Sequence, residues 1–376
     1  CTLSMKYRSI LPDGSAAGGP MYSIERGLGK GWKPLAVIFA LFAAICSFGT
    51  GNAVQSFTVA DQFRQDFGFP TWLVGLVMAS LIAMVILGGI RRIGRFMATL
   101  YVLASLLVLL FNYDKVPAAI AEVVTSAFTP AAEVGGFAGG GFIFMLVWGV
   151  KRGLFSNESG QGSAPIAHAA AKTDEPVREG MVAMLGPFVD TLLVCTMTGL
   201  VIVTTGAWHE RLPDVVRVNE QAALVAITDE ADVRKNGEIR SEDRAEGRFE
   251  VDQGDPLGFR LVRNHSTVGE AKLRYSTEDI LREEGRPFDG FVEFDEPGQI
   301  ARASLYDREG EPVPMDLVLH GNMLQNGSPL TGWAFRQGLS PIAGGYGHYL
   351  ITIAVFLFGL STAISWSYYG DRSVLY

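Results

Sequence analysis

The chain alternates between long apolar stretches and shorter polar links. At about 1.5 Å of rise per residue, the long stretches suit helices that cross a hydrocarbon core about 30 Å thick. Helices are the expected form because backbone polar groups in lipid must be paired within the segment. The pattern therefore predicts an all-α polytopic membrane protein. The expected spans are Pro34–Val59, Thr71–Ile90, Phe96–Phe111, Val134–Ala171, Met181–Ala207 and Tyr346–Tyr369.

One of these spans contains a polar break. The apolar run Phe142–Val150 leads into it, and the polar or flexible residues Ser156 to Ser163 then fall at membrane depth. Irregular backbone at that depth is tolerated only where it is buried in protein or lines a water-filled cavity. Many secondary transporters build their substrate and ion sites where two half-helices meet at such a break. Lys151–Ala171 is therefore the predicted functional centre.

The stretch from Ala207 to Asn326 follows a different pattern. Short, often alternating apolar segments are separated by turn sequences such as Asn236-Gly237, which favours antiparallel strands. We expect three parts: a transmembrane core over 1–206, a small β-rich insert over 207–326, and a re-entry loop with a last helix over 327–376. The expected strands are Ala222–Ile227, Gly247–Val251, Gly258–Val262, Lys272–Tyr275, Gly290–Phe294 and Ala301–Tyr306.

The composition is consistent with this division. Only 19% of the residues are charged and 48% are hydrophobic, whereas soluble domains carry about a quarter charged residues. Between Ala207 and Gly344 there are 16 basic and 26 acidic residues, so the net charge of −8 originates in this region. An acidic surface argues against nucleic acid as a partner. The cysteines are too few and too scattered for a disulfide framework or a metal site; they are Cys1, Cys46 and Cys195.

Basic residues in the short loops predict the orientation. If the N-terminal loop is cytoplasmic, only Arg64 and Lys115 fall in short outside loops. The insert would then lie outside, in the periplasm if the cell has two membranes, with the helices in the plasma membrane (the bacterial inner membrane). The chain has no initiator Met and no signal peptide, so we expect it to be a piece of a longer protein. A lipid-modified Cys1 is the alternative.

Several motifs together resemble one transporter family. They are Gly18–Gly29 (GGPMYSIERGLG), Gly51–Ser56 (GNAVQS), Arg152–Ala169 (RGLFSNESGQGSAPIAHA), Asp190-Thr191 with Cys195-Thr196, and Trp366–Gly370 (WSYYG). These motifs are similar to those of the alanine or glycine:cation symporters, also called sodium:alanine symporters. The resemblance covers most of 1–206 and 327–376. The stretch from Ala207 to about Asn326 has no recognised counterpart.

The resemblance implies a fold similar to the five-plus-five inverted-repeat transporters of the leucine-transporter type. It implies a secondary active transporter, and not an enzyme, that imports a small neutral amino acid with sodium or sometimes protons. Cys1 would then stand at the end of the second core helix, the broken helix would be the sixth, and the last span the eighth. The first core helix, with another glycine-rich break, would precede residue 1.

The break and the resemblance together indicate a substrate site. Free backbone N–H groups at the start of the second half-helix would meet a carboxylate, and free carbonyls around Phe155 would face an ammonium group or an ion. Side-chain oxygens there suit a hard cation. The alternative is that these polar residues only pair with one another between helices. The predicted substrate-binding residues are Ser156, Asn157, Gly160, Gln161, Gly162 and Ser163.

The last span carries the predicted ion site. In similar transporters the eighth helix supplies hydroxyl oxygens to a sodium ion, which would assign Ser361, Thr362 and Ser365 to ion binding. No other metal is expected. The alternative is that these hydroxyls bond back to their own helix.

Two carboxylates at membrane depth, Glu158 and Asp190, are coupling candidates. Glu158 could instead pair with Arg152, and Asp190 could anchor a buried hydrogen bond. On the first span, Asn52 and Gln55 share a face at i, i+3 spacing, and they could bond between helices or line the site.

The chain departs from the family pattern inside the break. The family commonly has Ala where Ser159 stands and Leu or Met where Gln161 stands. Both changes add polarity beside the predicted substrate side chain, so the substrate need not be restricted to alanine or glycine.

Two other classes of function compete with a symporter. A membrane-bound sensor would bind its ligand through the outside domain, but this leaves the polar break unexplained. A membrane-tethered enzyme would need an active site in the insert, which has no cysteine, no clustered histidines and no recognisable nucleophile motif. The partner of the insert is not indicated by the sequence.

Overall fold

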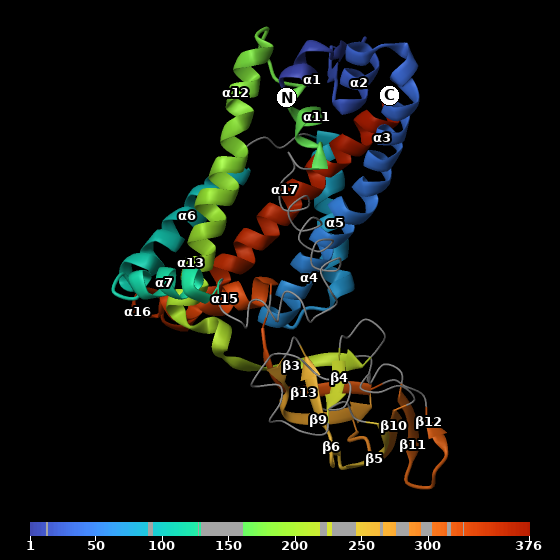
Figure 1. Cartoon of the computed structure of the whole chain (residues 1–376), viewed down its shortest axis with the longest axis vertical. Helices are drawn as coiled ribbons and strands as arrows, with labels where there is room; N and C mark the ends of the chain where they lie inside the picture. The colour runs from blue at the N-terminus through green and yellow to red at the C-terminus, as the bar shows by residue number, and fades with distance from the viewer. Residues whose placement is uncertain are drawn as a thin grey trace. The chain divides into compact units, whose positions relative to one another are not determined.

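The computed structural model describes residues 1–12, 14–88, 93–126, 128, 161–218, 224–227, 246–263, 266–275, 286–294, 303–313, 317–325 and 327–376. The chain forms two compact units (Figure 1). The first consists of Cys1–Ala119, Leu146–Thr205 and Gly327–Tyr376, and the second of Ile120–Met145 and Gly206–Asn326.

The first unit is mainly helical where it is described. A two-stranded ribbon of β1 (Ser9–Ile10) and β2 (Ala16–Ala17) lies near the N-terminus. The helices, of which α7 continues into the second unit, are α1 (Thr2–Lys6), α2 (Pro20–Leu28), α3 (Lys33–Cys46), α4 (Val54–Phe67), α5 (Thr71–Gly88), α6 (Ile93–Phe111), α7 (Val116–Ser126), α11 (Ala164–His168), α12 (Pro176–Pro187), α13 (Thr196–Thr205), α15 (Gly327–Gly338), α16 (Ser340–Ala343) and α17 (His348–Leu375).

Three continuous helical segments of the described chain are long and apolar enough to cross a membrane: Lys30–Phe67, Pro176–Thr205 and His348–Leu375. A fourth crossing is possible if Tyr101–Phe111 and Val116–Ser126, which meet at a bend of 99°, count as one broken span. Large apolar side chains on these and neighbouring helices are exposed, among them Leu41, Phe42, Trp72, Met184 and Leu192. Exposed apolar surface of this extent is typical of helices that face lipid. The protein is a multi-pass membrane protein.

The first span ends later than its sequence predicts. The span was expected to end at Val59, yet α4 continues as a helix to Phe67. Asp61 accepts hydrogen bonds from Arg64 at 2.8 Å and from Gln65 at 3.1 Å, and such i, i+3 and i, i+4 pairs support a helix. Gly68 then ends it in the left-handed conformation, at a φ of 71°, where glycine has no steric penalty.

Helix α17 is the element around which the first unit packs. It crosses the unit diagonally and contacts α3, α4, α5, α6 and α15 (Figure 1). Near one end, Trp366 and Tyr369 join a buried cluster with Met21 of α2 and Ile166 of α11. Further along, Leu360 joins a second cluster; its other fully buried members are Val59, Ala60, Val74 and Met78. Segments far apart in the sequence are therefore held together along one helix.

The second unit contains three antiparallel sheets in its described part. One has the strand order β12-β11-β10-β5-β6, another β3-β13-β9, and the third β4-β7-β8. The strands are β3 (Arg211–Val218), β4 (Leu224–Ile227), β5 (Gly247–Asp252), β6 (Asp255–Pro256), β7 (Arg260–Arg263), β8 (Ser266–Thr267), β9 (Gly269–Tyr275), β10 (Gly290–Phe294), β11 (Ala303–Asp307), β12 (Pro312–Val313) and β13 (Leu317–Leu324).

The described strands of this unit share one apolar core. Leu261 of β7, Val292 of β10 and Leu319 of β13 are among its fully buried members, and each comes from a different sheet. Strands occupy each of the six expected positions; β10 has the expected bounds and the bounds of the others are shifted by a few residues. Strands β3, β6, β8, β12 and β13 were not expected. On the surface, Arg308 pairs with the carboxylates of three residues; they are Glu250, Asp252 and Asp289. The hydrogen bond from Arg308 lowers the pKa of Asp289.

Candidate functional site

The polar break lies only partly within the described structure. Ser156, Asn157, Glu158 and Gly160 lie outside the described residues, which resume at Gln161. Gln161 and Gly162 are half-buried. Ser163 is 4% exposed and stands at the N-cap of α11, so the described end of the break faces the protein interior.

Gly162 is required by its backbone conformation. Its φ is 81°, which side chains rarely adopt, and a Cβ there would lie 3.4 Å from the ring of Phe39 on α3. The turn that joins the break to α11 is therefore placed against the first span.

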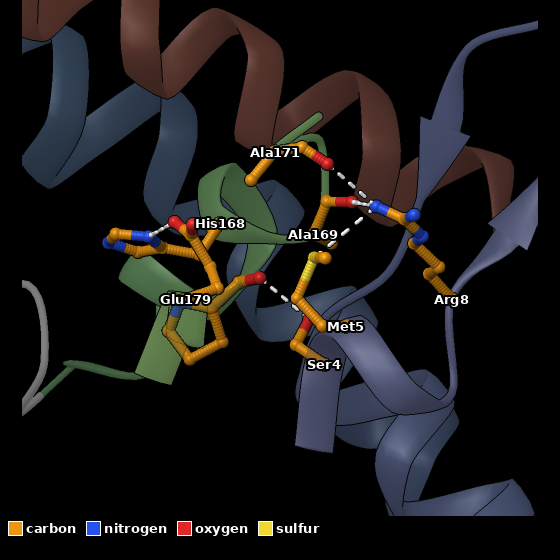
Figure 2. A network of polar contacts seen from close by, with 8 residues as sticks. Ser4, Met5, Arg8, His168, Ala169, Ala171 and Glu179 are labelled. Atoms are coloured by element: carbon orange, nitrogen blue, oxygen red, sulfur yellow. Dashed lines mark hydrogen bonds and ion pairs between the residues drawn. The ribbon is translucent and has the colours of Figure 1, made fainter. Parts of the chain in front are cut away.

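Helix α11, which follows the break, is held from two sides (Figure 2). On one side, Ser4 of α1 donates its hydroxyl proton to the carbonyl of Pro165 at 2.6 Å. On the other, His168 Nδ1 lies 2.5 Å from Oε1 of Glu179 on α12. The half-helix after the break is thus bonded to elements both N-terminal and C-terminal to it.

The predicted ion-binding residues lie on α17, and their environments differ. Ser361 is exposed, while Thr362 and Ser365 are half-buried. The Ser365 hydroxyl donates to the carbonyl of Ser361 at 3.0 Å, which is the alternative use expected for a helical serine. Helix α11 contacts α17, with Ile166 in the same buried cluster as Trp366. The structure therefore brings the helix after the break against the helix with the hydroxyls.

Asp190 lies on a helical segment of unusual geometry. Phe188–Cys195 is a π-helical segment that joins α12 to α13 within one continuous span, and Asp190 is exposed there. π-Helical segments inside helices occur frequently at functional sites. No group of three His, Cys, Asp or Glu side chains within the described ranges could hold a metal ion.

A second π-helical segment was not predicted from the sequence. Ser47–Ala53 joins α3 to α4, and a Cβ on Gly51 would overlap the ring of Trp366. Asn52 Oδ1 is buried and has no hydrogen-bond partner among the described residues. A buried amide oxygen of this kind is costly unless a partner satisfies it. The signal in the sequence was the interruption of an apolar run by Gly49, Gly51 and Asn52.

A polar junction between α4 and α17 was also missed. Gln62 donates to Asp66 Oδ2 at 2.9 Å, and Thr352 of α17 donates its hydroxyl proton to the same oxygen. Gln62 is 2% and Thr352 1% exposed. Asp66 and Thr352 are 286 positions apart in the sequence, which explains why no local pattern indicated the contact.

At the end of the unit that holds α2, charged residues lie at and beyond the ends of the helical spans. Tyr376 donates its hydroxyl proton to Glu25 at 2.6 Å, and Lys33 lies 3.4 Å from the same carboxylate. The hydrogen bond from Tyr376 and the nearby Lys33 lower the pKa of Glu25, while burial and Glu25 raise the pKa of Tyr376 to about 12. These residues fix the end of α17 to α2.

Comparison with known proteins identifies the family. The sequence model of the sodium:alanine symporter family matches residues 1–232. The chain is 48% identical over 217 residues to an uncharacterized transporter of Haemophilus influenzae, covering 56% of this chain and 47% of the relative. It is 47% identical over 214 residues to the sodium/alanine symporter AgcS of Methanococcus maripaludis, covering 54% of this chain and 46% of the relative.

A third relative is the putative sodium/proton-dependent alanine carrier protein YrbD of Bacillus subtilis, which is 37% identical over 220 residues, or 57% of this chain and 44% of the relative. The chain spans about half the length of the curated relatives it matches. The family match covers more than half of the chain and includes α11 with the described end of the break. The chain belongs to the sodium:alanine symporter family.

Proposed function

We propose that the protein containing this chain is a symporter that imports a small neutral amino acid, of the alanine or glycine type, together with sodium. The observation that carries the proposal is the packing of α11 against α17. Through Ile166 and Trp366, it places the helix that follows the polar break against the helix with the predicted ion-binding hydroxyls. The relative named a sodium/alanine symporter supports this substrate and this ion. The family is one of transporters, not of enzymes.

The proposed fold is the five-plus-five inverted repeat of the leucine-transporter type. Residues 1–206 and 327–376 would belong to it, and 207–326 would be a β-rich extracytoplasmic insert. The separate apolar core of the second unit supports an insert that folds as a body of its own. The distribution of basic residues supports a location in the bacterial inner membrane with the insert in the periplasm.

The proposed roles follow the break and the last span. Ser156, Asn157, Gly160, Gln161, Gly162 and Ser163 would bind the amino acid. Thr362, with Ser361 and Ser365, would bind sodium. Glu158 and Asp190 are the candidates for coupling, since carboxylates at membrane depth are rare and costly. Protons are the alternative coupling ion, because one relative is named a sodium/proton-dependent carrier.

Uptake by the full-length protein in proteoliposomes tests the proposal. Radiolabelled alanine or glycine should accumulate when an inward sodium gradient is imposed, and accumulation should vanish when the gradient is collapsed by an ionophore. Imposing a proton gradient without a sodium gradient tests whether protons, rather than sodium, drive the uptake. Accumulation that is indifferent to every imposed ion gradient would contradict symport.

A further inference from the structure

Arg8 is bonded to the end of the half-helix that follows the break (Figure 2). Its Nη1 donates to the carbonyls of Ala169 at 3.1 Å and Ala171 at 2.8 Å, and its Nη2 donates to the carbonyl of Thr173 at 3.2 Å. The same Nη1 lies 3.3 Å from the sulfur of Met5. One guanidinium therefore satisfies three carbonyls at and beyond the C-terminal end of α11.

This arrangement suits the charges involved. The carbonyl of Ala169 stands at the C-cap of α11, and those of Ala171 and Thr173 lie beyond the helix, so none of the three is bonded within it. A cation there is stabilising, and hydrogen bonds from a charged donor are stronger than those between neutral groups. Arg8 is half-buried, which reduces screening of these bonds by water.

Close packing reinforces the same contact. A Cβ on Gly18 would lie 2.6 Å from Cβ of Ala169, 3.0 Å from the carbonyl oxygen of Ser4 and 3.2 Å from Cβ of Arg8. A Cβ on Gly19 would lie 2.9 Å from Ile166 Cγ1. Glycine is thus needed at positions 18 and 19 because α11 packs so close to the backbone there that a larger residue would overlap it.

The segment that carries Arg8 is itself held in place. Arg26 of α2 donates to the carbonyls of Tyr7 at 2.8 Å and Arg8 at 3.1 Å, and to the hydroxyl of Ser9 at 2.5 Å. The motif around Gly18–Gly29 therefore has a structural role, because it fixes the strand-like segment from which Arg8 reaches α11.

We propose that Arg8 is a positioning residue for the amino-acid site. By fixing α11 from its C-terminal end, it fixes the place of Gln161–Ser163, which immediately precede that helix. This inference rests on the proposed function, since it assigns Arg8 to the same site without contact to the substrate. We call the hydrogen bonds from Arg8 to Ala169, Ala171 and Thr173 the clamp. Its loss weakens substrate binding and leaves unchanged the rate of transport by the substrate-bound protein.

Two variants disturb the clamp in different ways. Arg8→Gln removes the charge and most of the donors, whereas Gly18→Ala keeps the guanidinium but crowds Ala169 and the Cβ of Arg8. In the full-length protein each should raise KM for alanine by about tenfold while kcat per folded transporter changes by less than about twofold, the pattern of lost ground-state binding. Arg8→Lys, which keeps the charge, should recover part of the loss.

Matched controls lie nearby in the chain. Lys30→Gln removes an exposed cation, and Gly31→Ala adds a methyl group where no atom lies within 4 Å. Neither should alter KM. Unchanged KM in both Arg8→Gln and Gly18→Ala, or a fall of kcat at constant KM, would overturn the proposal. If Arg8→Gln fails to fold, Gly18→Ala and Arg8→Lys decide the question.

Hydrogen exchange supplies a readout that does not depend on transport. In Arg8→Gln, amides between residues 161 and 173 should exchange faster than in the wild type, with no change in the Lys30→Gln control. Faster exchange with unchanged KM would show a purely structural clamp and would contradict a role in binding. Absence of sodium-driven uptake by the wild type would refute the proposed symport instead, whatever the exchange shows.

Discussion

Within the described end of the break, the chain departs from the common family pattern at Gln161. It is half-buried and lies three residues before α11. If its amide bonds to a polar substrate side chain, Gln161→Leu should lower kcat/KM for serine about two- to tenfold, the worth of one neutral hydrogen bond. Uptake of alanine should change little, because a methyl side chain offers no partner.

The measurement is competitive uptake of labelled serine and alanine by the same variant. Gln65→Leu, at an exposed position of α4, is the matched control and should leave the ratio unchanged. An equal loss for both substrates would mean that Gln161 supports the backbone of the break and does not select the side chain.

The hydroxyls of α17 are not equivalent at the scale of single residues. Ser365 already donates to the carbonyl of Ser361, whereas Thr362 is half-buried beside it. Thr362→Val should therefore raise the sodium concentration for half-maximal uptake by about tenfold, as expected for a lost contact to a charge, and Ser365→Ala by less than about twofold.

Thr362→Ser should retain the sodium dependence, since it keeps the oxygen. Thr58→Val is the control, because the Thr58 hydroxyl donates to its own helix on the exposed side of α4. Equal sodium dependence in Thr362→Val and the wild type would exclude Thr362 as a sodium ligand.

At the scale of elements, α4 and α17 are joined by the buried junction of Gln62, Asp66 and Thr352. Thr352→Val removes one of the two donors to the Asp66 carboxylate and leaves it poorly satisfied. Such a loss lowers the free energy of unfolding by about 1–3 kcal/mol, and we expect Tm in detergent to fall by several degrees. Thr352→Ser should stay close to the wild type. A Tm equal to that of the wild type in Thr352→Val would show that water replaces the lost donor.

Long apolar stretches made the principal helices predictable from the sequence. The last span was expected over Tyr346–Tyr369, and α17 runs over His348–Leu375; the polar residues beyond Tyr369 stay helical. In the second unit β10 has the expected bounds, because alternation over Gly290–Phe294 reports the two faces of a strand directly. Both predictions depend on local sequence patterns alone.

Contacts between distant residues could not be predicted in this way. The bonds from Arg8 join residues more than 160 positions apart, and β3 pairs with β13 from Arg211 opposite Leu324 to Val218 opposite Leu317. The π-helical form of Ser47–Ala53 could not be predicted either, because Gly49, Gly51 and Asn52 mark an interruption of the apolar run without indicating the type of helix. The sequence indicated which segments carry polar residues, but only the folded structure shows which of these residues contact each other.

At the scale of the whole molecule, the helices of the first unit that precede and follow residues 206–326 in the sequence pack against each other. Helices α13 and α15 contact each other within the first unit, and a Cβ on Gly338 would lie 3.2 Å from Thr205. The core of the second unit is formed from its own strands. Each unit therefore has packing that does not depend on the other's core.

Deleting 207–326 tests what the strands of the second unit contribute. The 12 residues of α15 separate its start from Thr205 by about 17 Å, so a flexible Gly/Ser linker of about ten residues should close the gap. Because the helical packing is self-contained, we expect the deleted protein to fold and to keep kcat/KM for sodium-driven uptake within about twofold. Tm in detergent and uptake in proteoliposomes measure the two expectations separately. A folded protein with lost uptake would show that the insert takes part in the transport cycle, and a protein that fails to fold would show that the helices depend on it.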